Sequence, residues 1–352
     1  MRGRGDRLAA LVAERELEMT LVTELVNVSY LTGFGGTNGA CLCGGETRVF
    51  FTDFRYTERA EAEVEGWEVV TVTDDWLGGI AERFSGTVGF EDDHVSVRLL
   101  GRLEEKLHDG ATLKPAGGAV EQLRRVKDGE ELAAIAAAAE LTDEVWRWSI
   151  ERGLAGRTER GVAAAAEARI RELGAEPSFP AIVAGGPNGA LPHAEPGGRM
   201  IAEGELVVFD MGAKLDGYCS DGTRTFASGE PGEHAREVYE TVREAQAAAL
   251  GAVGPGVEGE AVDTAAREVI EAAGHGDRFG HGLGHGVGLE VHEGPRLSQR
   301  SEDTLAPGEV VTVEPGIYLP GDLGVRIEDL VVVTAEGHRN LSGLPKTLEI
   351  VA

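Results

Sequence analysis

Acidic side chains end three apolar runs of this sequence. The acids are Asp210, Glu314 and Glu328, each placed where a run of strand-like composition stops. A fourth acid, Asp221, follows Asp210 across a Gly-containing, hairpin-like connection that would return it to the same end of a strand pair. One carboxylate beside a turn is usually a solvated loop residue or a helix cap, but four in this pattern favour a site. Carboxylates this close need a raised pKa or a cation between them.

Three histidines add imidazole donors in the segment HGLGHGVGLEVHE. They are His281, His285 and His292, and the glycines around them allow close backbone approach. A single histidine would be interpreted as a satisfied core or surface residue, whereas three in one short segment favour a site. An acid-rich donor set with one or two imidazoles suits manganese, cobalt or iron better than structural zinc, which prefers thiolates. Two ions that share carboxylates would activate water, so the pattern predicts hydrolytic chemistry.

The first part of the chain alternates between strand-like and helix-like segments after an opening helix near residues 8–17. Strand-like runs lie at 20–25, 48–52, 68–73 and 87–91, and helix-like stretches at 54–64, 75–84 and 95–107. This alternation predicts a small α/β domain with crossover helices. Residues 114–118 are interpreted as a turn-rich break after the last strand.

The second part of the chain combines long helices with strands that look antiparallel. Asp128 and Glu131 form a capping-box pattern that opens a long helix, and further helices are predicted at 159–173, 234–253 and 260–273. The Gly/Pro-rich loop 185–198 lacks the Gly-Lys-Ser/Thr ending of a phosphate-binding loop. Helices that lie before and between antiparallel-looking strands are typical of an α+β layer. We therefore predict an α/β domain over residues 1–125 and an α+β domain over residues 126–352.

Composition narrows the classes of partner and compartment. The 352 residues include 33 basic and 61 acidic side chains, a formal net charge of −28, which argues against nucleic acid as a partner. No apolar stretch approaches the length of a membrane span or of a signal peptide core, so we expect no membrane association. Three cysteines without paired spacing indicate reduced thiols, and we expect a cytoplasmic protein.

At this point the motifs resemble a known family, the proline-specific metallopeptidases of pita-bread fold, which include Xaa-Pro dipeptidase (prolidase) and aminopeptidase P. The resemblance covers nearly the whole chain, and its second-domain motifs are DMGAKLDGYCSDGTRT, HGLGHGVGLEVHE, VEPGIY and GVRIEDL. In the first domain, VNVSYLTGFGGTNGA and FFTDFRYTERAEAEV resemble the amino-terminal module of the creatinase/prolidase type. One small departure is Gly222, where the family often carries an aliphatic residue.

The resemblance implies two divalent metal ions per chain, with manganese as the first expectation and cobalt, iron or zinc as alternatives. Asp221 and Glu328 would bridge the ions, Asp210 would bind one ion, and His285 and Glu314 would bind the other. A metal-bridged water would attack the scissile carbonyl of an Xaa-Pro bond in a small peptide with proline at the second position.

The resemblance also implies roles for residues around the metals. Glu314 would relay a proton to the departing proline nitrogen, while His193, His281, His292 and Arg326 would position the substrate and steady the intermediate. A homodimer is the expected assembly. Dipeptidase and aminopeptidase activities stay open, and the alternatives are a creatinase-like C–N hydrolase and a non-enzymatic binding module of the same fold.

Overall fold

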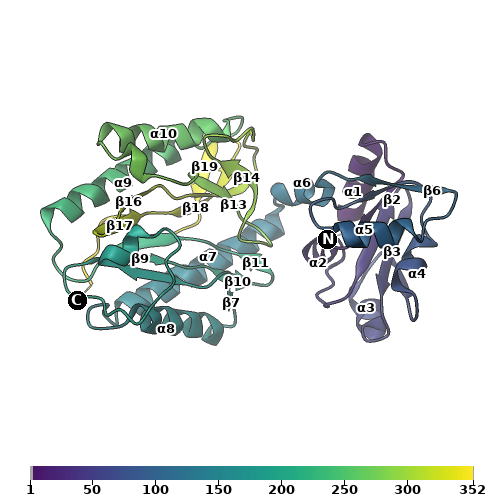
Figure 1. Ribbon diagram of the computed structural model, residues 1–352, viewed down its shortest axis with the longest axis horizontal. Helices are drawn as coiled ribbons and strands as arrows, with labels where there is room; N and C mark the ends of the chain where they lie inside the picture. The colour runs from purple at the N-terminus through teal and green to yellow at the C-terminus, as the bar shows by residue number, and fades with distance from the viewer. Residues whose placement is uncertain (1–2, 352) are drawn as a thin grey trace. The chain divides into compact units, whose positions relative to one another are not determined.

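The computed structural model describes residues 3–351, which form two compact units, Met1–Arg124 and Arg125–Ala352 (Figure 1). Each unit has its own sheets and its own buried core. Within residues 3–351 no helix is both long and apolar enough to span a membrane.

The first unit is built on one mixed sheet of six strands in the order β4-β3-β2-β1-β5-β6. The pairs β3/β4, β1/β5 and β5/β6 are parallel, and β1/β2 and β2/β3 are antiparallel. The strands are β1 (Met19–Val22), β2 (Ala40–Gly44), β3 (Thr47–Thr52), β4 (Glu68–Thr71), β5 (Gly86–Phe90) and β6 (Ala111–Pro115). The helices are α1 (Arg4–Glu14), α2 (Leu25–Thr32), α3 (Thr57–Glu63), α4 (Trp76–Ala81), α5 (Val97–Glu104) and α6 (Ala119–Arg125), the last of which ends at the first residue of the second unit.

The predicted α/β class of this unit is confirmed, but three of its segments differ from the sequence prediction. Leu25 begins helix α2 instead of ending a strand, because the apolar run that follows it has no period that separates a short helix from a strand. Strand β2 was not predicted. The predicted break at residues 114–118 was wrong at its start, since Lys114 and Pro115 end strand β6. That strand is the edge of the sheet, where proline costs no ladder hydrogen bond.

The second unit contains four small antiparallel sheets. Two of them have three strands each, in the orders β12-β9-β8 and β11-β10-β7, and the others are β14-β13-β15-β18-β19 and the hairpin β16-β17. The strands are β7 (Glu176–Pro177), β8 (Ile182–Gly185), β9 (Leu206–Asp210), β10 (Ala213–Leu215), β11 (Tyr218–Cys219), β12 (Thr223–Ala227), β13 (Gly284–Gly286), β14 (Glu293–Leu297), β15 (Val310–Val313), β16 (Gly316–Leu319), β17 (Leu323–Arg326), β18 (Asp329–Thr334) and β19 (Gly337–Asn340).

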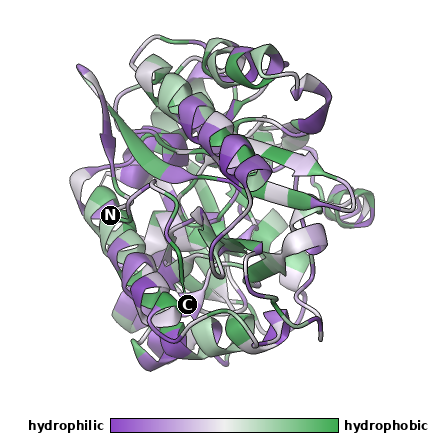
Figure 2. Cartoon of the chain, turned by 90° about the vertical axis from the view of Figure 1, so that its left-hand side faces the viewer, coloured by the Kyte–Doolittle hydropathy of each residue, from purple (hydrophilic) through white to green (hydrophobic). Residues whose placement is uncertain are grey.

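Two helix pairs cover these strands and divide the apolar core into two main clusters. The first pair, α7 (Gly129–Ile150) and α8 (Glu159–Glu172), packs with β8, β9, β10 and β12. The second pair, α9 (Glu233–Ala252) and α10 (Gly259–Ala272), packs with β15, β16, β17 and β18. The long outer helices carry polar and apolar residues side by side (Figure 2), as expected for helices with one buried face. The predicted α+β class is confirmed.

The sequence signals at helix and loop boundaries hold in detail. The Asp128 side chain accepts hydrogen bonds from the backbone N–H groups of Glu130 and Glu131, and the Glu131 carboxylate accepts one from the Asp128 N–H, which completes a capping box. The Gly/Pro-rich loop contains only a short 3-10 turn, η1 (Gly186–Ala190), and η2 (Gly276–Arg278) is a second.

Replacing Asp128 tests the capping box. Asp128→Ala leaves two N–H groups at the start of α7 without their side-chain acceptor, so we expect the free energy of unfolding to fall by about 1 kcal/mol. Urea denaturation followed by circular dichroism measures the change. Glu130→Ala, which removes an exposed neighbour from the same turn, is the control and should leave the stability nearly unchanged.

Candidate metal centre

Strand pairing brings Asp210 and Asp221 together. Asp210 is the last residue of β9, and Asp221 lies two residues before β12, which runs antiparallel to β9 with Thr223 opposite Asp210. The hairpin β10–β11 returns the chain between them, and its turn residues Asp216 and Gly217 have φ angles of 49° and 87°. This is the hairpin connection predicted from the sequence, with residue types that tolerate positive φ.

The other two acids come from a second strand pair. Glu314 directly follows β15 and Glu328 directly precedes β18, and these strands are antiparallel with Val313 opposite Asp329. Glu328 therefore lies at a break between β17 and β18 and not within one continuous strand. Both acids line the same cavity.

His285 is the central residue of β13, and the glycines on either side of it are required by the packing. A Cβ at Gly284 would lie 2.1 Å from the Thr312 carbonyl oxygen, and a Cβ at Gly286 would lie 2.1 Å from the Gly294 carbonyl oxygen. The neighbouring backbone therefore approaches β13 more closely than any side chain would allow. This close approach fixes the imidazole at the floor of the cavity.

Three buried carboxylates are crowded at the centre of the site. Asp210, Asp221 and Glu328 each offer an oxygen such that all three atoms lie within 4.8 Å of one another. Burial raises the pKa of Asp221 and Glu328 well above the ordinary range, and the like charges of their neighbours raise it further. Burial also raises the pKa of Asp210, although Arg326 opposes the shift.

Asp210 and Glu328 each have one carboxylate oxygen that accepts a hydrogen bond from the protein and one that does not. Arg326 Nη2 donates to Asp210 Oδ2 at 2.6 Å, and Thr223 Oγ1 donates to Glu328 Oε2 at 2.8 Å. Asp210 Oδ1 and Glu328 Oε1 are buried and have no hydrogen-bond partner among the described residues. Buried polar atoms of this kind normally have a partner, and anionic oxygens gathered at one point fit a divalent cation. The donor set thus suits the metal ions that the sequence predicted.

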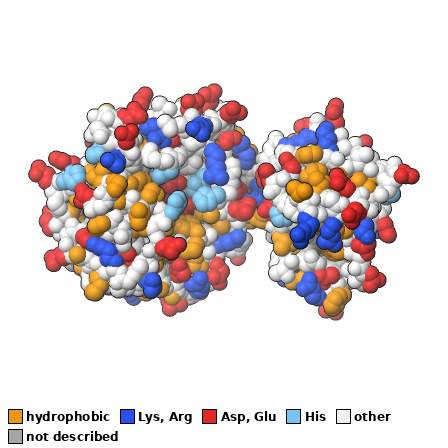
Figure 3. All heavy atoms as spheres, viewed as in Figure 1, with side chains coloured by type: hydrophobic (Ala, Val, Ile, Leu, Met, Phe, Trp, Pro, Cys, Tyr) orange, Lys and Arg blue, Asp and Glu red, His pale blue; other side chains and the backbone are white. Residues whose placement is uncertain are grey.

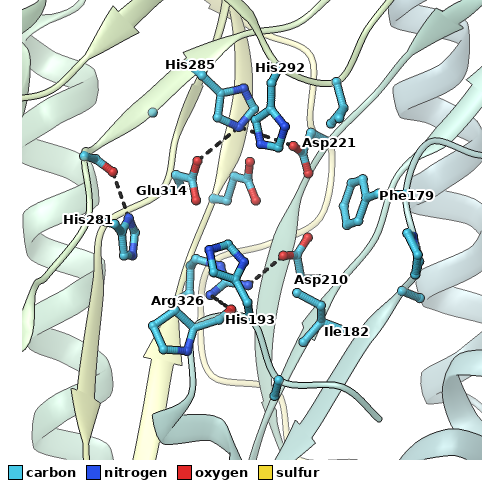
Figure 4. A pocket seen from close by; sticks show the side chains of 18 of the residues that line it. Phe179, Ile182, His193, Asp210, Asp221, His281, His285, His292, Glu314 and Arg326 are labelled. Carbon is cyan, nitrogen blue, oxygen red and sulfur yellow. Dashed lines mark hydrogen bonds and ion pairs between the residues drawn. The ribbon is translucent and has the colours of Figure 1, made fainter.

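His285 presents one ring nitrogen to the carboxylates. Its Nδ1 lies 3.1 Å from the Gly286 carbonyl oxygen, which can only accept, so Nδ1 carries a hydrogen and Nε2 faces the site. Nε2 lies 3.4 Å from Glu314 Oε1 and 3.6 Å from Asp221 Oδ2 (Figure 4). Although burial opposes ionisation of Glu314, the neighbouring His285, His281 and Arg326 lower its pKa to about 2. Glu314 is therefore ionised at neutral pH.

Arg326 ties one side of the centre to the cavity wall. Its guanidinium is buried and donates to Thr223 Oγ1 at 3.0 Å and to Tyr318 Oη at 2.9 Å, in addition to Asp210. Tyr318 Oη also lies 2.8 Å from His281 Nε2. One hydrogen-bonded chain thus runs from Asp210 through Arg326 and Tyr318 to His281.

The buried ion pair between Arg224 and Asp329 does not line the cavity but joins strands next to it. Arg224 on β12 lies with Nη2 2.7 Å from Asp329 Oδ1 on β18, and both side chains are almost completely buried. Asp329 also accepts hydrogen bonds from Gln246, Asn340 and Lys346. Because β12 follows Asp221 and β18 follows Glu328, this cluster fixes the two carboxylates relative to each other.

The cavity at the centre has a volume of about 700 Å³ and brings together every site residue predicted from the sequence. Histidine side chains gather on one face of the second unit (Figure 3). His193, His281 and His292 line the cavity, and the ring of His292 lies 4.3 Å from that of His285 between centroids. Burial lowers the pKa of His281 and His292, so both rings are neutral at pH 7.

Comparisons with known proteins identify the family of this chain. Residues 133–335, more than half of the chain, match the model of metallopeptidase family M24, and residues 4–126 match the creatinase/prolidase N-terminal domain. The chain belongs to metallopeptidase family M24. It is therefore a metallopeptidase with the two-domain prolidase fold, as the motif resemblance implied.

Individual relatives of this M24 chain extend over its whole length. It is 37% identical to the Xaa-Pro dipeptidase of Pyrococcus furiosus, with 99% of this chain and 100% of the relative covered. An Xaa-Pro dipeptidase structure from Bacillus anthracis is 36% identical, covers 99% of both chains and has a TM-score of 0.94. An X-Pro aminopeptidase structure from Thermotoga maritima is 35% identical, covers 99% of this chain and 100% of that one, and has a TM-score of 0.90.

Several residues of the M24 cavity were not predicted from the sequence. Phe179, Ile182 and Val291 form an apolar part of its lining, and Arg296 adds a cation (Figure 4 labels the first two). Apolar residues on separate loops carry no pattern that distinguishes a cavity wall from a core. Tyr318 was not singled out either, although it ends the VEPGIY motif four residues after Glu314.

The departure at Gly222 is compensated by packing. A Cβ at this position would lie 2.7 Å from Cη2 of Trp146, whose fully buried ring on α7 fills the space that an aliphatic side chain would take. The segment that leads from Asp221 into β12 is therefore packed by an aromatic ring from a helix.

Replacing Asp221 should change stability in opposite directions with and without metal. In the chelated protein, Asp221→Asn removes a charge from a buried cluster of like charges, so we expect the melting temperature at pH 7 to rise. In the presence of saturating divalent metal the same substitution removes an anionic ligand, so we expect the melting temperature to fall. Differential scanning calorimetry with chelator and with added metal measures both. A fall under both conditions would contradict the charge-crowding explanation.

Proposed function

We propose that this metallopeptidase hydrolyses Xaa-Pro bonds in small peptides with proline at the second position. The observation that carries the proposal is the cluster of buried carboxylates that lines one cavity together with His285. Proline lacks an N–H and has a fixed φ, so a peptidase that binds substrate as an added strand handles it badly. A cavity that surrounds the ring avoids this difficulty. Relatives named Xaa-Pro dipeptidase, 34% to 38% identical over nearly the whole chain, support the same substrate class.

We assign five metal ligands on the geometry of the oxygens. Asp221 and Glu328 would be shared by both ions, as the motif resemblance implies, and both belong to the buried carboxylate cluster. Asp210 binds one ion, and His285 and Glu314, which face each other, bind the other. Two divalent ions held there would lower the pKa of a water molecule and polarise the scissile carbonyl. Manganese is the first expectation for this oxygen-rich set, with cobalt, iron and zinc as alternatives.

The remaining residues handle protons and hold the substrate. Glu314 is ionised and lies at the cavity surface, so it can accept a proton and pass it to the departing proline nitrogen, a poor leaving group without one. His193, His281 and His292 are arranged around the same cavity and hold the substrate by hydrogen bonds. Arg326 keeps Asp210 in place and, through Tyr318, orients His281.

Arg296 favours the dipeptidase alternative over the aminopeptidase. Its side chain is exposed, lines the cavity and has no ion-pair partner among residues 3–351. A guanidinium in this position can pair with the free carboxylate of a dipeptide, which a longer peptide lacks at that place. The apolar lining from Phe179, Ile182 and Val291 suits an apolar residue before the proline.

The wider context of the enzyme is also proposed. We infer that residues 1–125 are the amino-terminal domain and residues 126–352 the catalytic domain. A cytoplasmic location is supported by three buried cysteines, none of which forms a disulfide among the described residues, as suits a reducing compartment. A homodimer rests on the family resemblance alone, and analytical ultracentrifugation tests it.

Substrate assays test the activity. With added Mn²⁺ we expect turnover of Ala-Pro and much slower turnover of Ala-Pro-Gly. Arg296→Met should raise KM for Ala-Pro roughly tenfold or more, because loss of a charged hydrogen bond costs about 1.5–3 kcal/mol, with a smaller effect on kcat. Arg300→Met, a nearby exposed arginine that does not line the cavity, is the control. No turnover of either peptide would contradict the proposed activity, and faster turnover of the tripeptide would favour the aminopeptidase.

Removal of a bridging ligand tests the metal assignment. Asp221→Asn and Glu328→Gln should abolish activity and lower the bound metal below two ions per chain, because each residue is assigned to both ions. Elemental analysis of the purified variants measures the metal, and Glu290→Gln, an exposed acid near the cavity, is the control. Near-full turnover by either variant would show that the bridging assignment is wrong.

A further inference from the structure

Lysine is rare in this chain, and two of its few lysines contact the same loop. The sequence contains five lysines among 33 basic residues, so arginine is the usual cation. Residues 287–292 connect β13 to β14, and this segment together with Glu293, the first residue of β14, is named here the histidine loop. Lys127 pairs with Glu293, and Lys214 Nζ donates to the Leu289 carbonyl oxygen at 3.0 Å.

Lys127 is buried against Glu293. Their side chains are 1% and 5% exposed, and Nζ lies 3.5 Å from Glu293 Oε2. Two other acids face the ammonium group, Glu131 and Glu309, and both are already held by donors of their own. Burial lowers the pKa of Lys127, and these three acids oppose the shift. Glu293 is the acid that Lys127 holds directly.

Glu293 in turn fixes the backbone of the histidine loop from inside. Its Oε1 accepts a hydrogen bond from the Glu290 N–H at 3.1 Å. A Cβ at Gly288 would lie 2.5 Å from Glu293 Oε2, so the carboxylate packs directly on the backbone at that position. Gly288 is also held through its carbonyl oxygen, which accepts from the Cys219 N–H at 2.7 Å. The conformation of the loop therefore depends on where the Glu293 carboxylate lies.

The loop carries two residues of the cavity. Val291 and His292 both line it, although His292 itself is exposed and its ring is held mainly by contact with the His285 ring. An exposed ring has little packing of its own, so its direction follows the backbone beneath it. Loss of the anchors would let the ring turn away from the cavity.

We propose that Lys127 and Lys214 are positioning residues that hold the histidine loop so that His292 faces the substrate. The inference rests on the proposed Xaa-Pro hydrolysis. Lysine suits both places because a compact ammonium meets one acceptor at each, and at Lys127 it also fits a closed space, whereas the planar guanidinium of arginine is wider. Without Lys127, the Glu293 carboxylate would be buried without its cation and would move toward water, taking the loop with it.

Single substitutions of the two lysines test the proposal. We expect Lys127→Met and Lys214→Met to lower kcat/KM for Ala-Pro by roughly 10- to 100-fold, mainly through KM, with metal content unchanged. Lys214→Met leaves no buried charge behind, so it decides the question if Lys127→Met does not fold. Hydrogen exchange of the amides at 287–293 in the metal-free protein should be faster in both variants. Lys106→Met, which breaks an exposed pair with Asp75 in the first unit, is the matched control.

A change at His292 separates positioning from a general loss of stability. In a His292→Phe background, either lysine substitution should lower kcat/KM less than about threefold, because the group that the loop positions is gone. An equal factor in both backgrounds would overturn the proposal, as would unchanged exchange of the loop amides. Wild-type cleavage of Ala-Pro is measured first, and the exchange experiment does not depend on turnover. Failure of the proposed function and failure of this inference are therefore distinguishable.

Discussion

Burial of like charges is the constraint on which the second unit depends. Asp210, Asp221 and Glu328 lie within a few ångströms of one another in the interior, where water cannot screen them. Burial of one such group is unfavourable, and the proximity of the others makes ionisation still less favourable. Protonation or a positive charge among them resolves the conflict, and the buried oxygens of Asp210 and Glu328 that have no hydrogen-bond partner among the described residues favour a cation. The carboxylates, and the strands that carry them, are arranged around a place for cations.

The fold holds one oxygen of two of these carboxylates in a fixed position. Arg326 occupies one oxygen of Asp210, and Thr223 occupies one oxygen of Glu328, while the second oxygen of each is left toward the centre. A ligand fixed at one oxygen has little freedom at the other, so the site is preorganised. The Arg224–Asp329 pair adds rigidity behind it, because it joins the strands that follow two of the acids.

Two histidines that line the cavity, His281 and His292, are held in different ways. His281 is fixed by Tyr318 and by the backbone around it: Arg267 donates to its carbonyl oxygen, and Asp263 pairs with Arg267. His292 instead lies on a loop held by a buried carboxylate and two lysines. The two imidazoles are thus held by different charged groups that do not themselves line the cavity, Arg267 and Asp263 for His281 and Lys127 and Lys214 for the loop of His292.

The sequence alone determined the two fold classes and the long helices, and it nominated the candidate site residues that the structure brings to one cavity. The capping box at Asp128 and the turn at Asp216 and Gly217 could be predicted because they depend on neighbours in the chain. Helix α2 and strand β6 were not, since short apolar runs have no decisive period and an edge strand accepts proline.

Only the tertiary structure decided how the site residues meet. Acids more than a hundred residues apart, such as Asp221 and Glu328, become neighbours because the Glu328 N–H donates to the Thr223 carbonyl oxygen at 3.0 Å and Thr223 Oγ1 donates to the Glu328 carboxylate. Such long-range contacts cannot be derived from local pattern. For the same reason the sequence did not predict that Phe179 and Ile182 line the cavity. It also did not predict the position of Lys127, because no local feature distinguishes this lysine from one on the surface. The residue types determine which chemistry is possible. The contacts between segments that are far apart in the sequence determine where in the molecule it can occur.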